Sequence, residues 1–173
     1  MTDLSIIIAP DPRLKRTAQP VTRVDHRVRR LMDNMLDTMH RANGIGLAAP
    51  QVGVLQRVIV VDISPPQSPP DPVCMADPEI IWQAEEAVTG EEGCLSLPEH
   101  YADVTRPKSV RVRYLDRAGE RRELNAEGLL AKCVQHEIDH LDGILFVDHL
   151  SSLKRNIILR KLVKSKKLAT VPA

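Results

Sequence analysis

The sequence contains few aromatic residues, with one Trp, two Tyr and one Phe among 173 positions. So small a set gives no platform on which nucleic-acid bases could stack. The net charge of +1 provides no general attraction to polyanions either. We therefore expect no sequence-specific binding to nucleic acid.

Cysteines and long apolar runs are also scarce. Cys74, Cys94 and Cys133 are too few, and odd in number, for a disulfide framework, which favours a reducing compartment. No apolar stretch approaches the roughly 20 residues that cross a bilayer. The start of the chain, residues 1–5, lacks the basic and apolar regions of a signal peptide. We expect a cytoplasmic protein without a membrane partner.

The hydrophobic pattern predicts segregated helices and strands. Apolar residues recur at helical spacing from a cap at Asp25 to Met39, and residues 57–63 and 109–115 have the composition of strands. Further expected elements are a proline-rich surface loop (64–72), a hairpin partner (120–124), a second helix (127–141, ended by Gly143) and a third helix from Ser151 or Ser152. This order indicates an α+β fold with N-terminal and C-terminal helices. We expect one domain over 1–173, with a basic C-terminal helix and tail at about 150–173.

The most informative motif lies in the second expected helix. His136 and His140 are four residues apart, so both imidazoles can reach one metal ion from the same helix face. Glu137 lies beside them, where it can act on water without being a ligand. The opposite face is apolar, so this HExxH helix should be buried at the centre of antiparallel sheets. The alternative is a helix with two histidines that only contact solvent or neighbouring groups.

A catalytic zinc-type site needs a third protein ligand and an open fourth position. In a long zincin pattern, Gly143 would be followed by a third His, but Phe146 occupies that place, which excludes that peptidase subclass. Cys94, flanked by glycine and polar residues, is not in a core-like context, whereas Cys133 is. An isolated cysteine is more often simply buried. Beside a two-histidine site that lacks a ligand, Cys94 becomes the candidate.

Three segments together resemble the motifs of peptide deformylases, in the same order: residues 44–51 (GIGLAAPQ), 92–96 (EGCLS) and 135–140 (QHEIDH). The resemblance covers nearly the whole chain. It implies hydrolytic removal of the formyl group from the N-terminal formyl-methionine of new polypeptides, with release of formate. It also implies that Cys94, His136 and His140 bind the metal and that Glu137 transfers the proton. The Gln51 side-chain amide and the Leu95 backbone N–H would then stabilise the oxyanion.

The resemblance also implies how the substrate binds. Ile45 and Gly46 would pair with the substrate backbone, and Ile45, Leu129, Cys133 and His136 would surround the methionine side chain. The alternative for Gly44 and Gly46 is that they only permit tight turns. Lys132 lies beside this pocket. Tyr101 stands where many relatives have an arginine that holds the substrate, and Arg106 is not an obvious replacement.

Ligand type alone leaves the metal open, because a His₂Cys set suits several divalent ions. The resemblance implies Fe²⁺ in the cell, with Zn²⁺, Ni²⁺ or Co²⁺ able to substitute, and an oxygen-sensitive ferrous site.

The C-terminal segment is basic. After Asp148 there is no acidic residue, and the cations are Lys154, Arg155, Arg160, Lys161, Lys164, Lys166 and Lys167. A solvated helix explains such a run, but the resemblance implies docking to the ribosome near the exit of the nascent chain.

Two other functions fit the same motifs. One is a different metallohydrolase, a peptidase built on the HExxH helix. The other is a non-enzymatic protein that holds a structural metal or binds the ribosome. A structural site would be closed by four protein ligands, and neither Cys74 nor Cys133 is a good fourth.

Overall fold

The computed structural model describes residues 4–170, so our expectations for the first three residues and for 171–173 of the basic tail lie outside it. Three α-helices occur in this part of the chain: α1 (His26–Arg41), α2 (Gly128–Leu141) and α3 (Ser152–Thr170). The three helices begin within two residues of the predicted positions, and α1 and α2 also end within two residues of them. The prediction of a basic helix and tail at about 150–173 does not separate the end of the helix from the tail.

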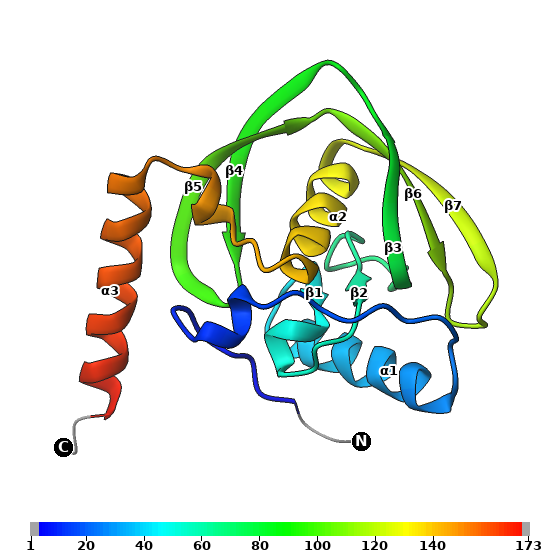
Figure 1. Cartoon of the computed structure of the whole chain (residues 1–173), viewed down its shortest axis with the longest axis horizontal. Helices are drawn as coiled ribbons and strands as arrows, with labels where there is room; N and C mark the ends of the chain where they lie inside the picture. The colour runs from blue at the N-terminus through cyan, green and yellow to red at the C-terminus, as the bar shows by residue number, and fades with distance from the viewer. Residues whose placement is uncertain (1–3, 171–173) are drawn as a thin grey trace.

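The strands form two antiparallel sheets (Figure 1). The larger has the order β1-β2-β3-β6-β7, with β1 (Gly46–Ala48), β2 (Val58–Val61), β3 (Val73–Gln83), β6 (Ser109–Leu115) and β7 (Arg121–Glu127). The smaller is the hairpin of β4 (Ala87–Cys94) and β5 (Leu97–Pro107). Helices beside antiparallel sheets confirm the predicted α+β class. The expected strands at 57–63 and 120–124 are present with shifted ends.

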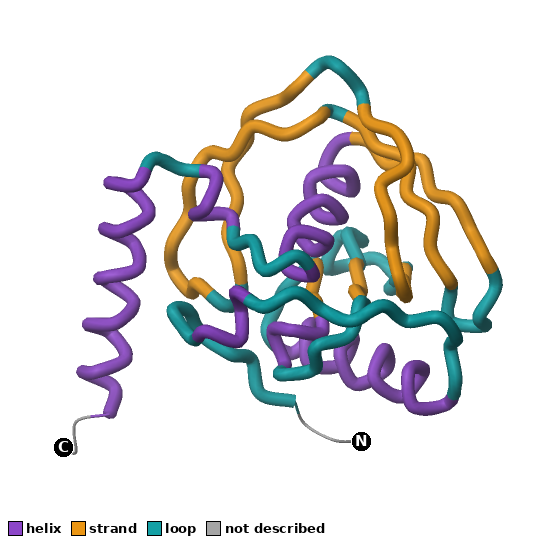
Figure 2. The backbone as a smooth tube through the Cα atoms, in the orientation of Figure 1, coloured by secondary structure: helices purple, strands orange, loops and turns teal. Residues whose placement is uncertain are grey.

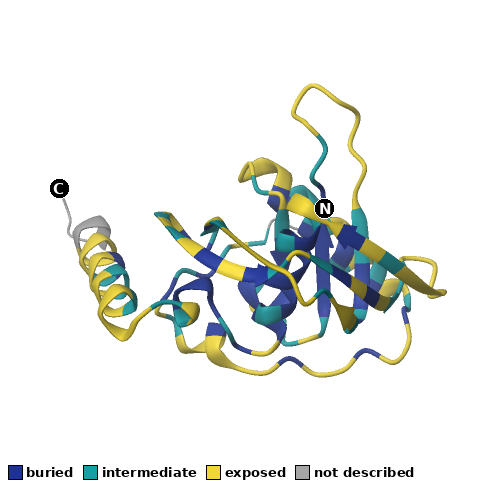
Figure 3. Cartoon of the chain, turned by 90° about the horizontal axis from the view of Figure 1, so that it is seen from above, coloured by how far each residue is buried: buried dark blue, intermediate teal, exposed yellow. Residues whose placement is uncertain are grey.

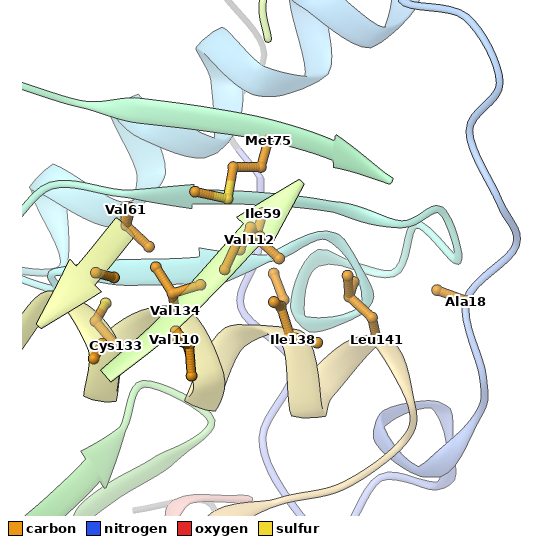
Figure 4. Packing of buried hydrophobic residues seen from close by; sticks show 13 residues of the cluster. Ala18, Ile59, Val61, Met75, Val110, Val112, Cys133, Val134, Ile138 and Leu141 are labelled. Atoms are coloured by element: carbon orange, nitrogen blue, oxygen red, sulfur yellow. The ribbon is translucent and has the colours of Figure 1, made fainter. Parts of the chain in front are cut away.

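Helix α2 lies between the two sheets, as the tube in Figure 2 shows. Its apolar face is buried: Val134, Ile138 and Leu141 pack against Ile59 and Val112 of the large sheet (Figure 4). Burying side chains of this size contributes roughly 1.5–3 kcal/mol each. This packing fixes the rotation of α2 about its axis and thereby directs the histidine face away from the large sheet.

Glycine is required at position 143, just after the end of α2, for a steric reason. It follows the C-cap of α2 with φ +73°, a conformation that favours glycine. A Cβ atom at this position would lie 2.5 Å from the backbone oxygen of Lys15. The helix can therefore pack closely against the N-terminal segment only because residue 143 has no side chain.

Helix α1 begins as predicted, since the Asp25 side chain accepts a hydrogen bond from the backbone N–H of Val28. Its methionine stripe, Met32, Met35 and Met39, is fully buried in a second core cluster. The apolar residues that recur at helical spacing in this segment therefore form the buried face of α1.

Helix α3 lies at one end of the molecule and is exposed along most of its length (Figure 3). Leu162 is buried against a third cluster, whereas Leu153 is 67% exposed. Within residues 4–170, none of the helices combines the length and apolar character needed to cross a bilayer.

Candidate metal centre

The three predicted metal ligands meet at one place. Cys94 is the last residue of β4, and His136 and His140 project from α2. One donor atom from each lies within 4.8 Å of the others, and Cys94 Sγ is 3.4 Å from His140 Nε2. Tetrahedral coordination at bond lengths of 2.0–2.3 Å separates donor atoms by roughly 3.3–3.6 Å. The cluster therefore fits one divalent cation.

Glu92 orients His136 from behind. Glu92 Oε1 lies 2.9 Å from His136 Nδ1, so the ring donates there and keeps the lone pair of Nε2 for a metal. Burial by itself would raise the pKa of the Glu92 carboxyl. The hydrogen bonds from His136 and Arg106 outweigh this effect and lower the pKa to about 2. Glu92 is therefore a carboxylate at all physiological pH values.

Arg106 belongs to this supporting layer and not to the cleft. Its Nε and Nη2 donate to the two Glu92 oxygens at 2.6 and 2.9 Å, and its Nη1 donates to Asp139 at 2.9 Å. Asp139 also lies 2.8 Å from the Nε2 of His149. Sequence reasoning missed Glu92, Asp139 and His149, although the first two lie inside the recognised motifs. Arg106 is buried, so it is not the substrate-holding arginine.

The two histidines differ in their electrostatic environment. For His140, burial and the charges of His136 and Arg106 lower the pKa well below its usual value, so the ring is neutral, the form that binds metals. For His136, burial favours the neutral ring, but the hydrogen bonds to Cys94 and Glu92 outweigh burial. The net result is a pKa well above its usual value.

Glu137 is a buried carboxylate that is easily protonated. Its side chain points to the cleft, 4% of the residue is exposed, and Oε2 has no hydrogen-bond partner among the described residues. Burial raises the pKa to about 7 against the opposing charge of His136. A Cβ atom at Gly46 would lie 2.6 Å from Glu137 Oε1, so only glycine permits this approach. A base with a pKa near neutrality can both accept and return a proton.

Gln51 is held rigidly beside the ligands. It lies in the short helix η2 (Ala49–Val52), and its Oε1 accepts the backbone N–H of Ala48 at 2.9 Å. This bond fixes the amide, so Nε2 faces Ser96 Oγ at 3.0 Å and Cys94 Sγ at 3.5 Å. Leu95 follows Cys94 in the turn between β4 and β5 and lines the same cleft. The predicted oxyanion donors are thus both next to Cys94.

A cleft of about 450 Å³ opens in front of these groups. All four predicted substrate-binding residues line it: Ile45, Gly46, Leu129 and Cys133. Burial, followed by the charges of Glu137 and Glu92, raises the pKa of the Cys133 thiol well above its usual value. Cys133 is therefore a neutral, apolar part of the wall.

Lys132 and Tyr101 also line the cleft. Lys132 Nζ donates a hydrogen bond to the backbone oxygen of Glu91 at 2.7 Å, so this side chain reaches from α2 to β4. Tyr101 is 63% exposed and pairs with Gly93 across the β4–β5 hairpin. A Cβ at Gly93 would lie 2.5 Å from the Tyr101 ring, so the ring covers the glycine.

Comparison with known proteins gives a consistent result. Residues 4–156 match the family model described as polypeptide deformylase. A peptide deformylase of Methylocella silvestris is 57% identical over 166 residues, covering 94% of this chain and 85% of that relative. The crystal structure of peptide deformylase from Ehrlichia chaffeensis superposes with a TM-score of 0.93 at 37% identity, covering 98% of this chain and 100% of that one. A second structure of the Ehrlichia chaffeensis enzyme, in complex with actinonin, has a TM-score of 0.91 at 40% identity and covers 95% of this chain and 98% of that one. As its three motifs predict, the chain belongs to the polypeptide deformylase family.

Proposed function

We propose that this chain hydrolyses the formyl group from the N-terminal formyl-methionine of new polypeptides and releases formate. The observation that carries the proposal is a buried Glu137 carboxylate, whose Oε2 has no hydrogen-bond partner among residues 4–170, beside a three-donor metal site that lines a cleft. A formamide is small enough to reach this buried site. Family membership supports the same reaction.

Cys94, His136 and His140 would hold the metal, and we propose Fe²⁺ as the ion in the cell, with Zn²⁺, Ni²⁺ or Co²⁺ able to replace it. The donor set of one thiolate and two imidazoles suits each of these ions. A bound divalent ion supplies Lewis acidity, which polarises the formyl carbonyl and acidifies water.

Glu137 would carry the proton through the reaction. As water attacks the formyl carbon, Glu137 accepts its proton. As the C–N bond breaks, Glu137 returns that proton to the amine nitrogen, and the formyl carbon leaves as formic acid, which loses its remaining acidic proton to solvent and becomes formate. The pKa of about 7, raised mainly by burial, suits both transfers.

Gln51 and Leu95 would stabilise the negative oxygen that develops on the attacked carbonyl. The Gln51 amide is already locked by Ala48 and Ser96, so little reorganisation is needed during the reaction. The Leu95 backbone N–H lies in the neighbouring turn and would act as the second donor.

The substrate backbone would add to the large sheet at β1. Among residues 4–170 this strand pairs with β2 alone and forms one edge of the sheet, so its outer side can accept an extended peptide. Ile45 and Gly46 lie at this edge and line the cleft. The methionine side chain would then enter between Ile45, Leu129 and Cys133.

Formate measurement tests the proposal directly. The wild type should release formate from formyl-Met-Ala-Ser, whereas Glu137→Ala should retain the metal and lose nearly all turnover. Glu85→Ala, which removes an exposed carboxylate away from the cleft, is the control. Metal content is measured on every sample. Formate release by Glu137→Ala at the wild-type rate would refute the assigned role.

The same experiment separates the alternatives. A peptidase would cleave internal bonds of an unformylated peptide without releasing formate. A structural-metal protein would do neither, and its site would need four protein ligands. Within residues 4–170 the cluster comprises the three donors Cys94, His136 and His140.

We also propose that the basic helix α3 docks on the ribosome near the exit of the nascent chain, in the cytoplasm. Its exposed face carries lysines and arginines, and such a face is attracted to ribosomal RNA. Deleting the residues after Lys164 should weaken co-sedimentation with ribosomes and leave activity on formyl-Met-Ala-Ser intact. Equal ribosome binding by the truncated protein would contradict the docking proposal but not the enzymatic one.

A further inference from the structure

Lys132 places a cation on the helix face that carries residues proposed for the methionine pocket. Leu129, Lys132, Cys133 and His136 follow the spacing i, i+3, i+4 and i+7, so they share one face of α2. All four line the cleft. The Lys132 side chain therefore lines the same cleft as the residues proposed to surround the methionine side chain.

Strand β4 holds this ammonium near Gly90 and Glu91. The Lys132 side chain crosses from α2 to β4, where its Nζ lies 2.7 Å from the Glu91 oxygen. A Cβ atom at Gly90 would be 3.8 Å from the same Nζ. The β4 backbone at Gly90 therefore runs alongside the Lys132 amine.

The Lys132 ammonium has N–H groups that are available to a ligand. An ammonium carries three N–H groups. With the described residues, Lys132 makes one hydrogen bond and no ion pair within 4.0 Å. A ligand in the cleft can therefore receive a charge-assisted hydrogen bond without displacing a carboxylate from Lys132.

We infer that Lys132 makes this enzyme accept peptides whose formylated first residue is methionine sulfoxide. This inference rests on the proposed deformylase function and defines its substrate range. Oxidation adds to the methionine sulfur one oxygen, a strong hydrogen-bond acceptor. A purely apolar pocket would reject that oxygen, because burying an unpaired polar group is unfavourable. Here the Lys132 ammonium can donate to it, and the hydrolysis itself is unchanged.

The test compares three substrates in each protein: formyl-Met-Ala-Ser, its sulfoxide, and formyl-norleucine-Ala-Ser. The readout is the ratio of kcat/KM for the sulfoxide to that for the norleucine peptide. Lys132→Met should lower this ratio roughly 10-fold or more, the effect of losing a hydrogen bond to a charged group. Lys108→Met is the matched control, because Lys108 pairs with Glu86 outside the cleft. Its ratio should equal that of the wild type.

Product binding provides a readout that needs no turnover. The dissociation constants of Met-sulfoxide-Ala-Ser and norleucine-Ala-Ser, measured by calorimetry, should diverge in the same direction when Lys132 is replaced. An unchanged ratio in Lys132→Met, in turnover and in binding, would overturn the inference even if formyl-methionine is hydrolysed normally. Absence of formate from every substrate would instead refute the proposed function. The product affinities would then still decide whether Lys132 recognises the sulfoxide.

Discussion

Glu137 is a residue at which stability and chemistry should oppose each other. Its carboxylate is buried, and Oε2 has no hydrogen-bond partner among residues 4–170. Burial raises the pKa of this group from 4.5 to about 7. Replacing Glu137 by glutamine keeps the shape and removes the charge. We therefore expect Glu137→Gln to lose turnover and to make the metal-free protein more stable than the wild type at alkaline pH.

The size of the expected stability difference follows from the pKa of Glu137 in the unfolded and in the folded protein. A folded-state pKa above the unfolded value means that folding favours the protonated form. This contribution to stability is present below pH 4.5 and is lost as the pH rises through 7. The difference between the two pKa values corresponds to about 3 kcal/mol. In a chain of this length, that free energy shifts Tm by about 6–12 °C.

The assay is urea unfolding of the metal-free proteins between pH 4 and pH 8. The buried glutamine amide adds a constant offset, so the test is how the difference in unfolding free energy between variant and wild type changes with pH. The difference in unfolding free energy between Glu137→Gln and the wild type should grow by about 3 kcal/mol from pH 4 to pH 8. Glu85→Gln, at an exposed position, should show no such growth. Adding a divalent cation should reduce the effect, because its charge favours the Glu137 carboxylate. Parallel pH profiles for wild type and Glu137→Gln would refute the reasoning.

Two other substitutions test the surroundings of the site. Arg106→Met leaves Glu92 and Asp139 without their shared cation, so unfolding free energy should fall by roughly 3–5 kcal/mol in denaturant titrations. Metal affinity, measured by competition with a chelator, should fall about 10- to 100-fold, and unchanged affinity would contradict the role of Arg106. Gly46→Ala should displace the Glu137 carboxylate, because the added methyl lies 2.6 Å from Oε1. A kcat loss of about 100-fold with the metal retained is expected, and wild-type kcat would show that the carboxylate tolerates the shift.

The sequence predicts best what is encoded locally. His136 and His140 are four residues apart on a helix, so they share one face regardless of the tertiary fold. The apolar pattern on the other face predicts that the helix packs against the core. The cap at Asp25 and the methionine stripe of α1 depend on neighbouring residues in the same way. Such features need no knowledge of long-range contacts.

The strands β3, β4 and β5 were not predicted individually. The β4 segment contains Gly90, Gly93 and two glutamates, a composition that is depleted in strands. Its pairing with β5 and the packing of the hairpin near α2 stabilise it as a strand. Here tertiary contacts override local preference.

The same hairpin explains why the supporting layer of the site cannot be predicted from sequence spacing. Glu92 pairs with Ala102, and Arg106 pairs with Val88, so Glu92 and Arg106 are an even number of positions apart in register and lie on one face of the hairpin. A shift of one residue in that register would turn Arg106 to the opposite face, leaving Glu92 buried with His136 as its only partner. The orientation of a metal ligand on α2 therefore depends on strand pairing elsewhere. A substitution that changes the β4–β5 register should weaken metal binding without touching any ligand.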